Sequence, residues 1–246
     1  MADDLAFLAE LPEPQRSDRI IAAFRTLVSG VPWVEGSIAE LWSGFLNSPL
    51  TRRRDEWLKR LAKVVIELHD NHPNLTPEQL LNNDQFLSAV LNTTNLALRT
   101  HQQFKLHALH QAVRSAILNS DIEEDQQAIF TRYIDDLTPW HLRMLMFFHD
   151  PNVHLRRRGF SEPWLVEVDG HQGVWSTNKK TQILLERGFA ELGHEFQFRS
   201  QLIQDLGLRQ LICVSTVGQD LPDIGPYTTT TGQRFIRFAG LESFDN

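Results

Sequence analysis

The chain has 246 residues, of which 41% are hydrophobic and 22% are charged, and its formal net charge at pH 7 is -7. This composition is typical of a globular protein and argues against both a disordered and a membrane-embedded chain. The negative charge disfavours a protein whose whole surface contacts nucleic-acid phosphates. The length allows one large domain or two ordinary ones.

The single cysteine, Cys213, lies in the apolar run 211–214, so we expect a small buried side chain and no internal disulfide. The N-terminal residues 1–13 are acidic and contain no long apolar core, unlike a signal peptide. No run of about 18 apolar residues occurs, so no transmembrane segment is predicted. The expected location is the cytoplasm.

Apolar residues at helical spacing dominate residues 1–150. Two helix starts are explicit, because Thr76 and Thr138 are each followed by a proline that suits the first helical position. The stretch 83–119 contains neither glycine nor proline, and it predicts one long helix with a kink near 92–95. The other predicted helices cover about 17–28, 35–48, 51–70, 123–136 and 138–150.

The pattern changes at Pro151. We predict a short basic loop over 154–158, then two helices, a strand at 211–215, a turn rich in glycine and proline, and a last helix at 232–239. Residues 227–231 either return as a second wing strand or cap that last helix. This order is typical of a winged-helix module. The predicted fold is therefore mainly α, with an N-terminal multi-helix bundle (residues 1–150) followed by a small winged-helix-like α+β domain (residues 151–246).

Two segments resemble known families. Residues 132–145 contain Leu-Thr-Pro-Trp-His-Leu-Arg-Met-Leu at 137–145, which resembles an "LTPWHLRxL" segment of uncharacterised bacterial helical proteins. The layout also loosely resembles the alpha-type abortive-infection family, and residues 228–238 (TTTTGQRFIRF) resemble the closing helix of winged-helix domains. These resemblances imply a bacterial origin and a role in phage defence, and they supply no catalytic residues.

Histidines and nucleophiles give no catalytic or metal site. His101, His107 and His110 lie in the predicted long helix, but residues 85–120 contain no carboxylate to complete a metal site. The sequence has no GxSxG, GxGxxG or Walker A motif. We therefore predict no catalytic residue, no metal and no cofactor.

A nucleic-acid surface is the first alternative, and it would lie on the C-terminal domain. The run 156–158 could contact phosphates, and the predicted helix at 195–208 has glutamines that could reach base edges. Glu195 and Asp205 in the same helix oppose it. The candidate residues are Arg156, Arg157, Arg158, Gln197, Arg199, Gln201, Arg209 and Arg234.

A membrane or partner surface is the second alternative. Trp33, Trp42 and Phe45 belong to an apolar stripe over 31–46, which could enter a bilayer interface or a partner's groove. Its polar residues include no lysine or arginine, so core packing is favoured.

The leading hypothesis is a non-enzymatic interaction or regulatory protein of a bacterium that binds a protein partner, in phage defence or a stress response. The two alternatives are a winged-helix DNA-binding regulator and a membrane-perturbing effector that uses residues 31–46. Integral membrane insertion is not expected, and the oligomeric state and the identity of the partner stay open.

Overall fold

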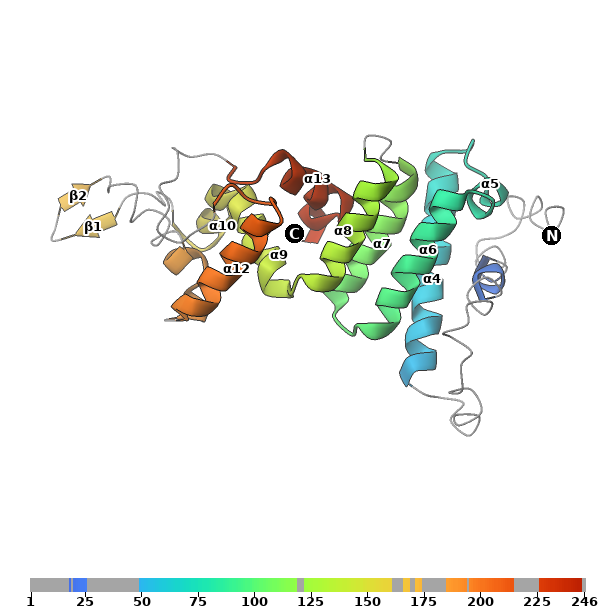
Figure 1. Ribbon diagram of the computed structural model, residues 1–246, viewed down its shortest axis with the longest axis horizontal. Coiled ribbons are helices and arrows are strands. Elements are labelled where there is room, and N and C mark those ends of the chain that lie inside the picture. Colours follow the sequence, from blue (N-terminus) through green and yellow to red (C-terminus); the bar gives the residue numbers. More distant parts are fainter. Residues whose placement is uncertain are drawn as a thin grey trace. The chain divides into compact units, whose positions relative to one another are not determined.

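The structure, a computed structural model, describes residues 18, 20–25, 49–118, 122–160, 166–168, 171–173, 185–193, 195–214 and 226–244. The described chain is mainly helical, which confirms the predicted α class (Figure 1). None of its helices is both long and apolar enough to cross a membrane.

The chain divides into two compact units. The first contains the described residues up to Asp135 together with Phe238–Gly240, and the second contains 136–237 together with the residues from Leu241 onward. The sequence placed the division near residue 151 because the composition changes there. The helix that opens at Thr138 belongs to the second unit.

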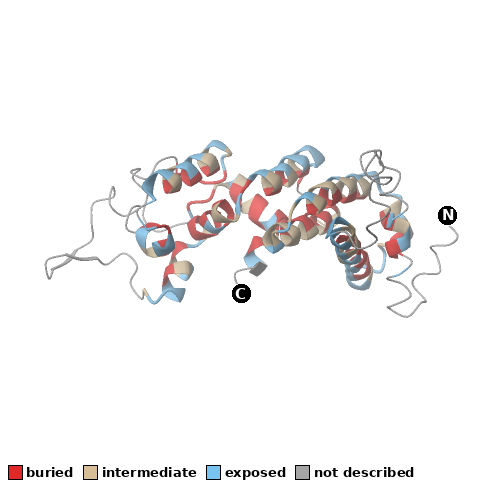
Figure 2. Ribbon diagram, turned by 90° about the horizontal axis from the view of Figure 1, so that it is seen from below, coloured by how far each residue is buried: buried red, intermediate tan, exposed pale blue. Residues whose placement is uncertain are grey.

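The first unit is a bundle built on α4 (Pro49–Asn71), α5 (Pro77–Leu81), α6 (Asp84–Arg99), α7 (Gln103–Leu118) and α8 (Glu124–Asp136). Helices α4, α6 and α7 pack against one another, and α5 packs against α4 and α6 (Figure 1). The helices in Figure 2 are buried along one side and exposed along the other, as amphipathic helices are.

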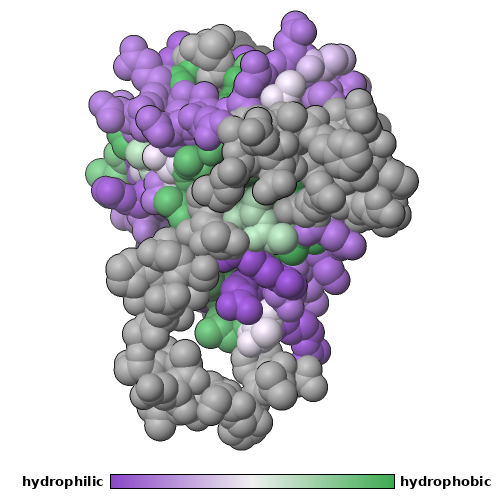
Figure 3. All heavy atoms as spheres, turned by 90° about the vertical axis from the view of Figure 1, so that its right-hand side faces the viewer, coloured by the Kyte–Doolittle hydropathy of each residue, from purple (hydrophilic) through white to green (hydrophobic). Residues whose placement is uncertain are grey.

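Helix α4 confirms the predicted apolar face. Its Trp57 is 1% exposed and donates from Nε1 to Thr94 Oγ1 of α6 at 2.9 Å. On the side of α4 and α5, most of the described residues visible in Figure 3 are hydrophilic. The predicted face residues are all buried: Trp57, Leu58, Leu61, Val64, Val65 and Leu68.

The predicted long helix is two helices. The chain leaves the helical conformation at Thr100, whose φ is -109° and ψ is 148°, and α7 begins at Gln103. Residues 92–95, where a kink was predicted, lie inside the uninterrupted helix α6: Thr93 and Thr94 are buried, and their hydroxyls donate to the Val90 carbonyl at 3.2 and 2.6 Å. Because α6 and α7 pack on each other, the break lets both apolar faces be buried, which one straight helix could not achieve.

The second unit is organised around α9 (Pro139–His149), which packs against α10 (Pro151–Arg157), α12 (Phe196–Leu208) and the 3-10 turn η3 (Leu241–Phe244). The basic segment 154–158 was predicted as a loop, and most of it is instead the helix α10. Asp150 caps α10 by accepting from the Val153 amide at 3.0 Å. The unit also contains η2 (Ala190–Leu192) and α13 (Thr230–Phe238).

The winged-helix prediction is not supported. Strands β1 (Val166–Val168) and β2 (His171–Gly173) form an antiparallel hairpin, but it lies before α12. Between α12 and α13 the described residues hold one antiparallel bridge, Ile212 with Thr228, and no strand. A single bridge buries too little backbone to make a wing.

In residues 228–238, which resemble a winged-helix closing segment, the glycine at position 232 is required by close packing against the backbone. A Cβ on Gly232 would lie 2.0 Å from the Leu211 carbonyl oxygen, so only glycine fits there. Thr229 fixes this approach from both sides, because its amide donates to the Leu211 carbonyl at 3.1 Å and its Oγ1 accepts from the Gly232 amide at 2.9 Å.

Candidate functional site

The segment 137–145, the most specific motif of the sequence, begins α9. Leu137 is buried, and Thr138 is the N-cap, followed by Pro139 at the first helical position as predicted. Leu142, Met144 and Leu145 are buried in the core. The remaining members, Trp140, His141 and Arg143, are the polar or amphipathic positions at which a site could form.

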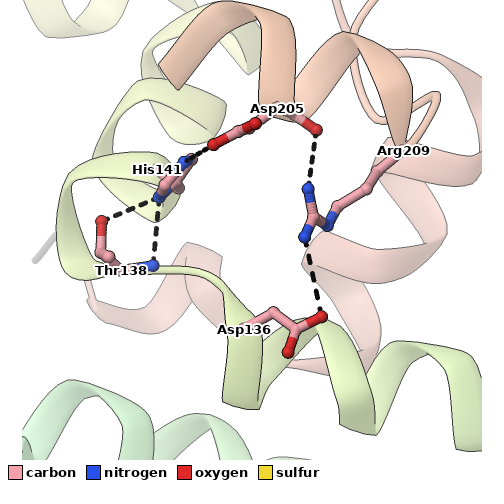
Figure 4. Close-up of polar contacts among 5 residues, drawn as sticks. All are labelled: Asp136, Thr138, His141, Asp205 and Arg209. Atoms are coloured by element: carbon pink, nitrogen blue, oxygen red, sulfur yellow. Dashed lines mark hydrogen bonds and ion pairs between the residues drawn. The ribbon is translucent and has the colours of Figure 1, made fainter. Parts of the chain in front are cut away.

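His141 links α9 to α12 (Figure 4). Its ring is buried, with a side chain 10% exposed, and its Nε2 lies 3.1 Å from Asp205 Oδ2. On the other side, Nδ1 lies 3.1 Å from the Thr138 amide and 2.8 Å from Thr138 Oγ1. The histidine thus takes the third position of an N-terminal capping box, where Glu or Gln is usual.

The hydrogen bonds fix the tautomer of His141. A backbone amide can only donate, so Nδ1, which faces the Thr138 amide, must carry a lone pair rather than a proton. The proton of the neutral ring therefore sits on Nε2 and is donated to the Asp205 carboxylate. Both ring nitrogens are satisfied without any ligand.

An ion pair lies beside this hydrogen bond. Arg209, in the last turn after α12, donates from Nη1 to the Asp205 carbonyl at 3.2 Å and places Nη2 3.6 Å from Asp136 Oδ2 (Figure 4). The Asp136 side chain is 45% exposed, so this pair contributes little to stability. Together, Asp136, Thr138, His141, Asp205 and Arg209 form what we call the α9–α12 polar network.

The network contains an Asp–His–Thr sequence of contacts, the residue types of a nucleophilic triad. Its geometry opposes that chemistry. If Nδ1 of His141 took the Thr138 hydroxyl proton, an N–H group would face the Thr138 amide at 3.1 Å, and the cap of α9 would be lost. The network is better suited to holding α9 against α12 than to transferring protons.

Trp140 and Arg143 serve packing on the other flank. The Trp140 ring lies edge-on to Phe189, with centroids 6.4 Å apart, and Arg143 Cζ stands 5.1 Å from the centre of the Trp140 ring. Gly188 allows this aromatic layer to close, because a Cβ there would lie 2.5 Å from the Phe147 ring. The motif is therefore explained residue by residue as the structural centre of the second unit.

The predicted nucleic-acid residues do not share one role. Arg156 and Arg157 are exposed on α10, but Arg158 makes a two-pronged pair with Glu191, both distances being 3.0 Å. These hydrogen bonds from Arg158 lower the pKa of the Glu191 carboxyl. Arg199 is only 7% exposed.

Helix α12 presents an uncharged outer face. Gln197, Gln201 and Gln204 are exposed at helical spacing, and Leu208 completes the row with 82% of its surface exposed. Phe196, at the start of the helix, is 53% exposed. We call these five residues the α12 outer face. Arg234, another candidate, is half-buried on α13, and Arg209 belongs to the α9–α12 polar network.

The histidines of the first unit lie on or near α7. His101 is exposed in the break before α7, while His107 and His110 are half-buried on the helix. The pKa of His110 is lowered from 6.5 to about 4, mainly by burial and in addition by electrostatic repulsion from His107, Arg60, Arg114 and Lys63. The part of the chain that the structure describes contains no group of three or more His, Cys, Asp or Glu placed to hold a metal.

Cys213 was predicted to be buried, and that prediction is wrong. Its side chain is exposed, with Sγ 3.1 Å from the Tyr227 carbonyl. Trp33, Trp42 and Phe45 lie outside the described residues.

Comparison with known proteins adds no assignment: no protein-family model, curated protein or solved structure matches the chain. The contact of His141 with Asp205 was not predicted from the sequence. There, Asp205 entered only as a negative charge that opposes phosphate binding. The residues are 64 positions apart, and no local pattern pairs them. Only the unusual histidine three residues after an N-cap threonine could have drawn attention to it.

Proposed function

We propose that the protein is a non-enzymatic interaction protein of a bacterium that binds a protein partner through the α12 outer face. The observation that supports this is Leu208, 82% exposed beside three uncharged glutamines. Protein interfaces are depleted of charge at their centre and rich in large side chains. Burying one such apolar side chain contributes about 1.5–3 kcal/mol, whereas glutamines desolvate at a lower cost than charged groups.

The interior side of α12 supports the same role. Two of its charged residues contribute to the fold, since Arg199 is buried and Asp205 is hydrogen-bonded to His141. The helix is thus anchored by its polar contacts and leaves the α12 outer face for another molecule. The resemblance of residues 137–145 to bacterial proteins supports placing this interaction in phage defence or a stress response.

Site-specific photo-crosslinking in bacterial cells tests this proposal. A photoreactive amino acid at Gln201 is expected to give a discrete adduct with one partner, identified by mass spectrometry, and Leu208→Glu should abolish that adduct. The matched control is the same amino acid at Ala128, an exposed, uncharged position on α8. Equal labelling at both positions, or none at Gln201, would contradict the proposal.

DNA binding is the second candidate, and the exposed Arg156 and Arg157 favour it. Fluorescence anisotropy with mixed-sequence duplex at two salt concentrations tests it. Affinity should fall with salt, and it should fall again in the Arg156→Ala/Arg157→Ala variant. An affinity that neither salt nor the double variant lowers would exclude DNA binding through Arg156 and Arg157.

The membrane-perturbing alternative rests on residues 31–46, which lie outside the described residues. Liposome leakage is its test, with Trp42→Glu as the variant. Leakage that Trp42→Glu leaves unchanged would end that alternative.

A further inference from the structure

Helices α4 and α7 pack against each other in the first unit, and polar side chains from the two helices meet there. Arg60 Nη2 donates to Gln103 Oε1 at 2.8 Å, and Arg114 Nη1 lies 3.9 Å from Glu67 Oε2. Residues three and four apart share a helix face, so the polar residues of each helix form a continuous row. What we call the α4–α7 seam consists of Arg60, Lys63 and Glu67 from α4 and Gln103, His107, His110 and Arg114 from α7.

The seam concentrates positive charge in a chain that is negative overall. Between its ends it contains three permanent cations and two histidines against one carboxylate, that of Glu67, while Glu56 and Asp70 continue the α4 row on either side. Helix α7 contains no acidic residue. The cations are near enough to His110 to act on its protonation, as its lowered pKa indicates. Like charges on facing helix surfaces repel one another, and a bound anion would relieve that repulsion.

A metal ion is a poor occupant of the seam despite the His107–His110 pair. The positive potential that disfavours a proton on His110 also disfavours a divalent cation. An anion meets the opposite condition. Arginine guanidinium groups present paired donors that match phosphate oxygens, and lysine adds a point charge.

We propose that the α4–α7 seam binds the phosphate group of a small molecule. Arg60, Lys63 and Arg114 supply the positive charge, and the ring of His110 supplies a further N–H donor. The seam is open to solvent, because Lys63 is exposed and the Arg114 side chain is 37% exposed. This site lies in the first unit and does not depend on the α12 outer face.

Histidine NMR on the full chain tests the proposal, with inorganic phosphate, pyrophosphate and a nucleoside triphosphate as probes at constant ionic strength. We expect a saturable shift of the His107 and His110 ring signals with at least one of them. The pKa of His110 should rise in the bound state, because an anion favours the imidazolium form. The uncharged nucleoside and added chloride should cause neither change.

Matched variants make the test specific. Arg60→Gln/Arg114→Gln should weaken binding by about tenfold or more, since two charge-assisted contacts are lost. Arg52→Gln/Arg53→Gln removes the same charge from exposed positions of the same helix and should change affinity less than about twofold. Lys63→Gln, at an exposed position, gives a second loss-of-binding variant whose folding is not at risk.

Three outcomes would overturn the proposal. The first is the absence of a saturable shift up to about 10 mM of every phosphate probe, because a site with a Kd in the millimolar range or below would be mostly filled at that concentration. The second is equal weakening by the seam variant and by its matched control. The third is a shift with duplex DNA alone, which would make the seam a nucleic-acid contact. None of these depends on the crosslinking at Gln201, so the two proposals fail separately.

Discussion

His141 Nε2 and Asp205 Oδ2 lie 3.1 Å apart and join α9 to α12 in the second unit, although 64 positions separate them in the sequence. The same ring closes the N-terminal cap of its own helix through Nδ1. One side chain therefore serves both local and tertiary structure, and its removal should affect both.

The first prediction concerns this link. His141→Ala should lower the free energy of unfolding by about 1–3 kcal/mol, because the Thr138 amide and the Asp205 carboxylate both lose a partner. Asp205→Asn keeps an oxygen that can accept from Nε2 and should cost less than about 1 kcal/mol. Urea denaturation of the three proteins measures both values. Equal stability of His141→Ala and the wild type would show that the link is energetically neutral.

The second prediction is the tautomer. In ¹H–¹⁵N spectra of the imidazole ring at pH 8, His141 should show a protonated Nε2 and an unprotonated Nδ1, because the Thr138 amide donates to Nδ1. The Asp205→Ala variant removes the acceptor and should leave the Nε2 proton in faster exchange with water. A protonated Nδ1 in the neutral ring would contradict the arrangement in Figure 4.

The third prediction concerns Gly232. Gly232→Ala should destabilise the protein by about 2–3 kcal/mol, because its Cβ would overlap the Leu211 carbonyl, a backbone atom that cannot rotate away. Thr230→Ala, at an exposed position of the same helix, is the control and should change stability by less than about 0.5 kcal/mol. Thermal unfolding followed by circular dichroism compares the two, and a similar loss in both would count against the close approach.

The fourth prediction is a stabilising substitution. Gln210 has φ of 55° after α12, and the Leu211 amide donates to the Leu206 carbonyl at 3.0 Å, as in a Schellman cap. Glycine adopts this conformation without the Cβ penalty, so Gln210→Gly should raise the free energy of unfolding by about 1 kcal/mol. Gln204→Gly, inside α12, should lower it by a similar amount. Two changes of the same sign would refute this cap.

The fifth prediction is a pH dependence from His110. Its pKa of about 4 in the folded protein lies below the usual 6.5, so between these values the unfolded chain binds more protons. Stability from this residue is present above about pH 6.5 and is lost as the pH falls toward 4. His110→Gln should therefore remove on the order of 1–3 kcal/mol from the stability difference between pH 7 and pH 4.5.

The control for that prediction is His101→Gln, which changes an exposed histidine in the break before α7. Urea denaturation of the wild type and both variants at the two pH values isolates the His110 part. The same pH dependence in His110→Gln as in the wild type would place the ring in an environment unlike the α4–α7 seam.

Local chemistry in the sequence determined the helices and their starts. The apolar spacing of α4 predicted its buried face, and Thr76 with Pro77 predicted α5, where the Thr76 amide donates to Gln79 Oε1 at 3.0 Å and Thr76 Oγ1 accepts in return. These features need only residues three or four apart, and a sequence displays such neighbours directly.

Tertiary structure decided the break at Thr100, the pairing of His141 with Asp205, and the burial of Arg199. No glycine or proline marks the break in the sequence. The break forms because burying both α6 and α7 against α4 favours it more than the local helix propensity opposes it. The His141 contact and the buried arginine depend on how α9 and α12 meet. The sequence alone therefore determined most of the helical segments, with α10 as an exception, while packing between distant helices decided where they turn and which polar side chains remain available for binding.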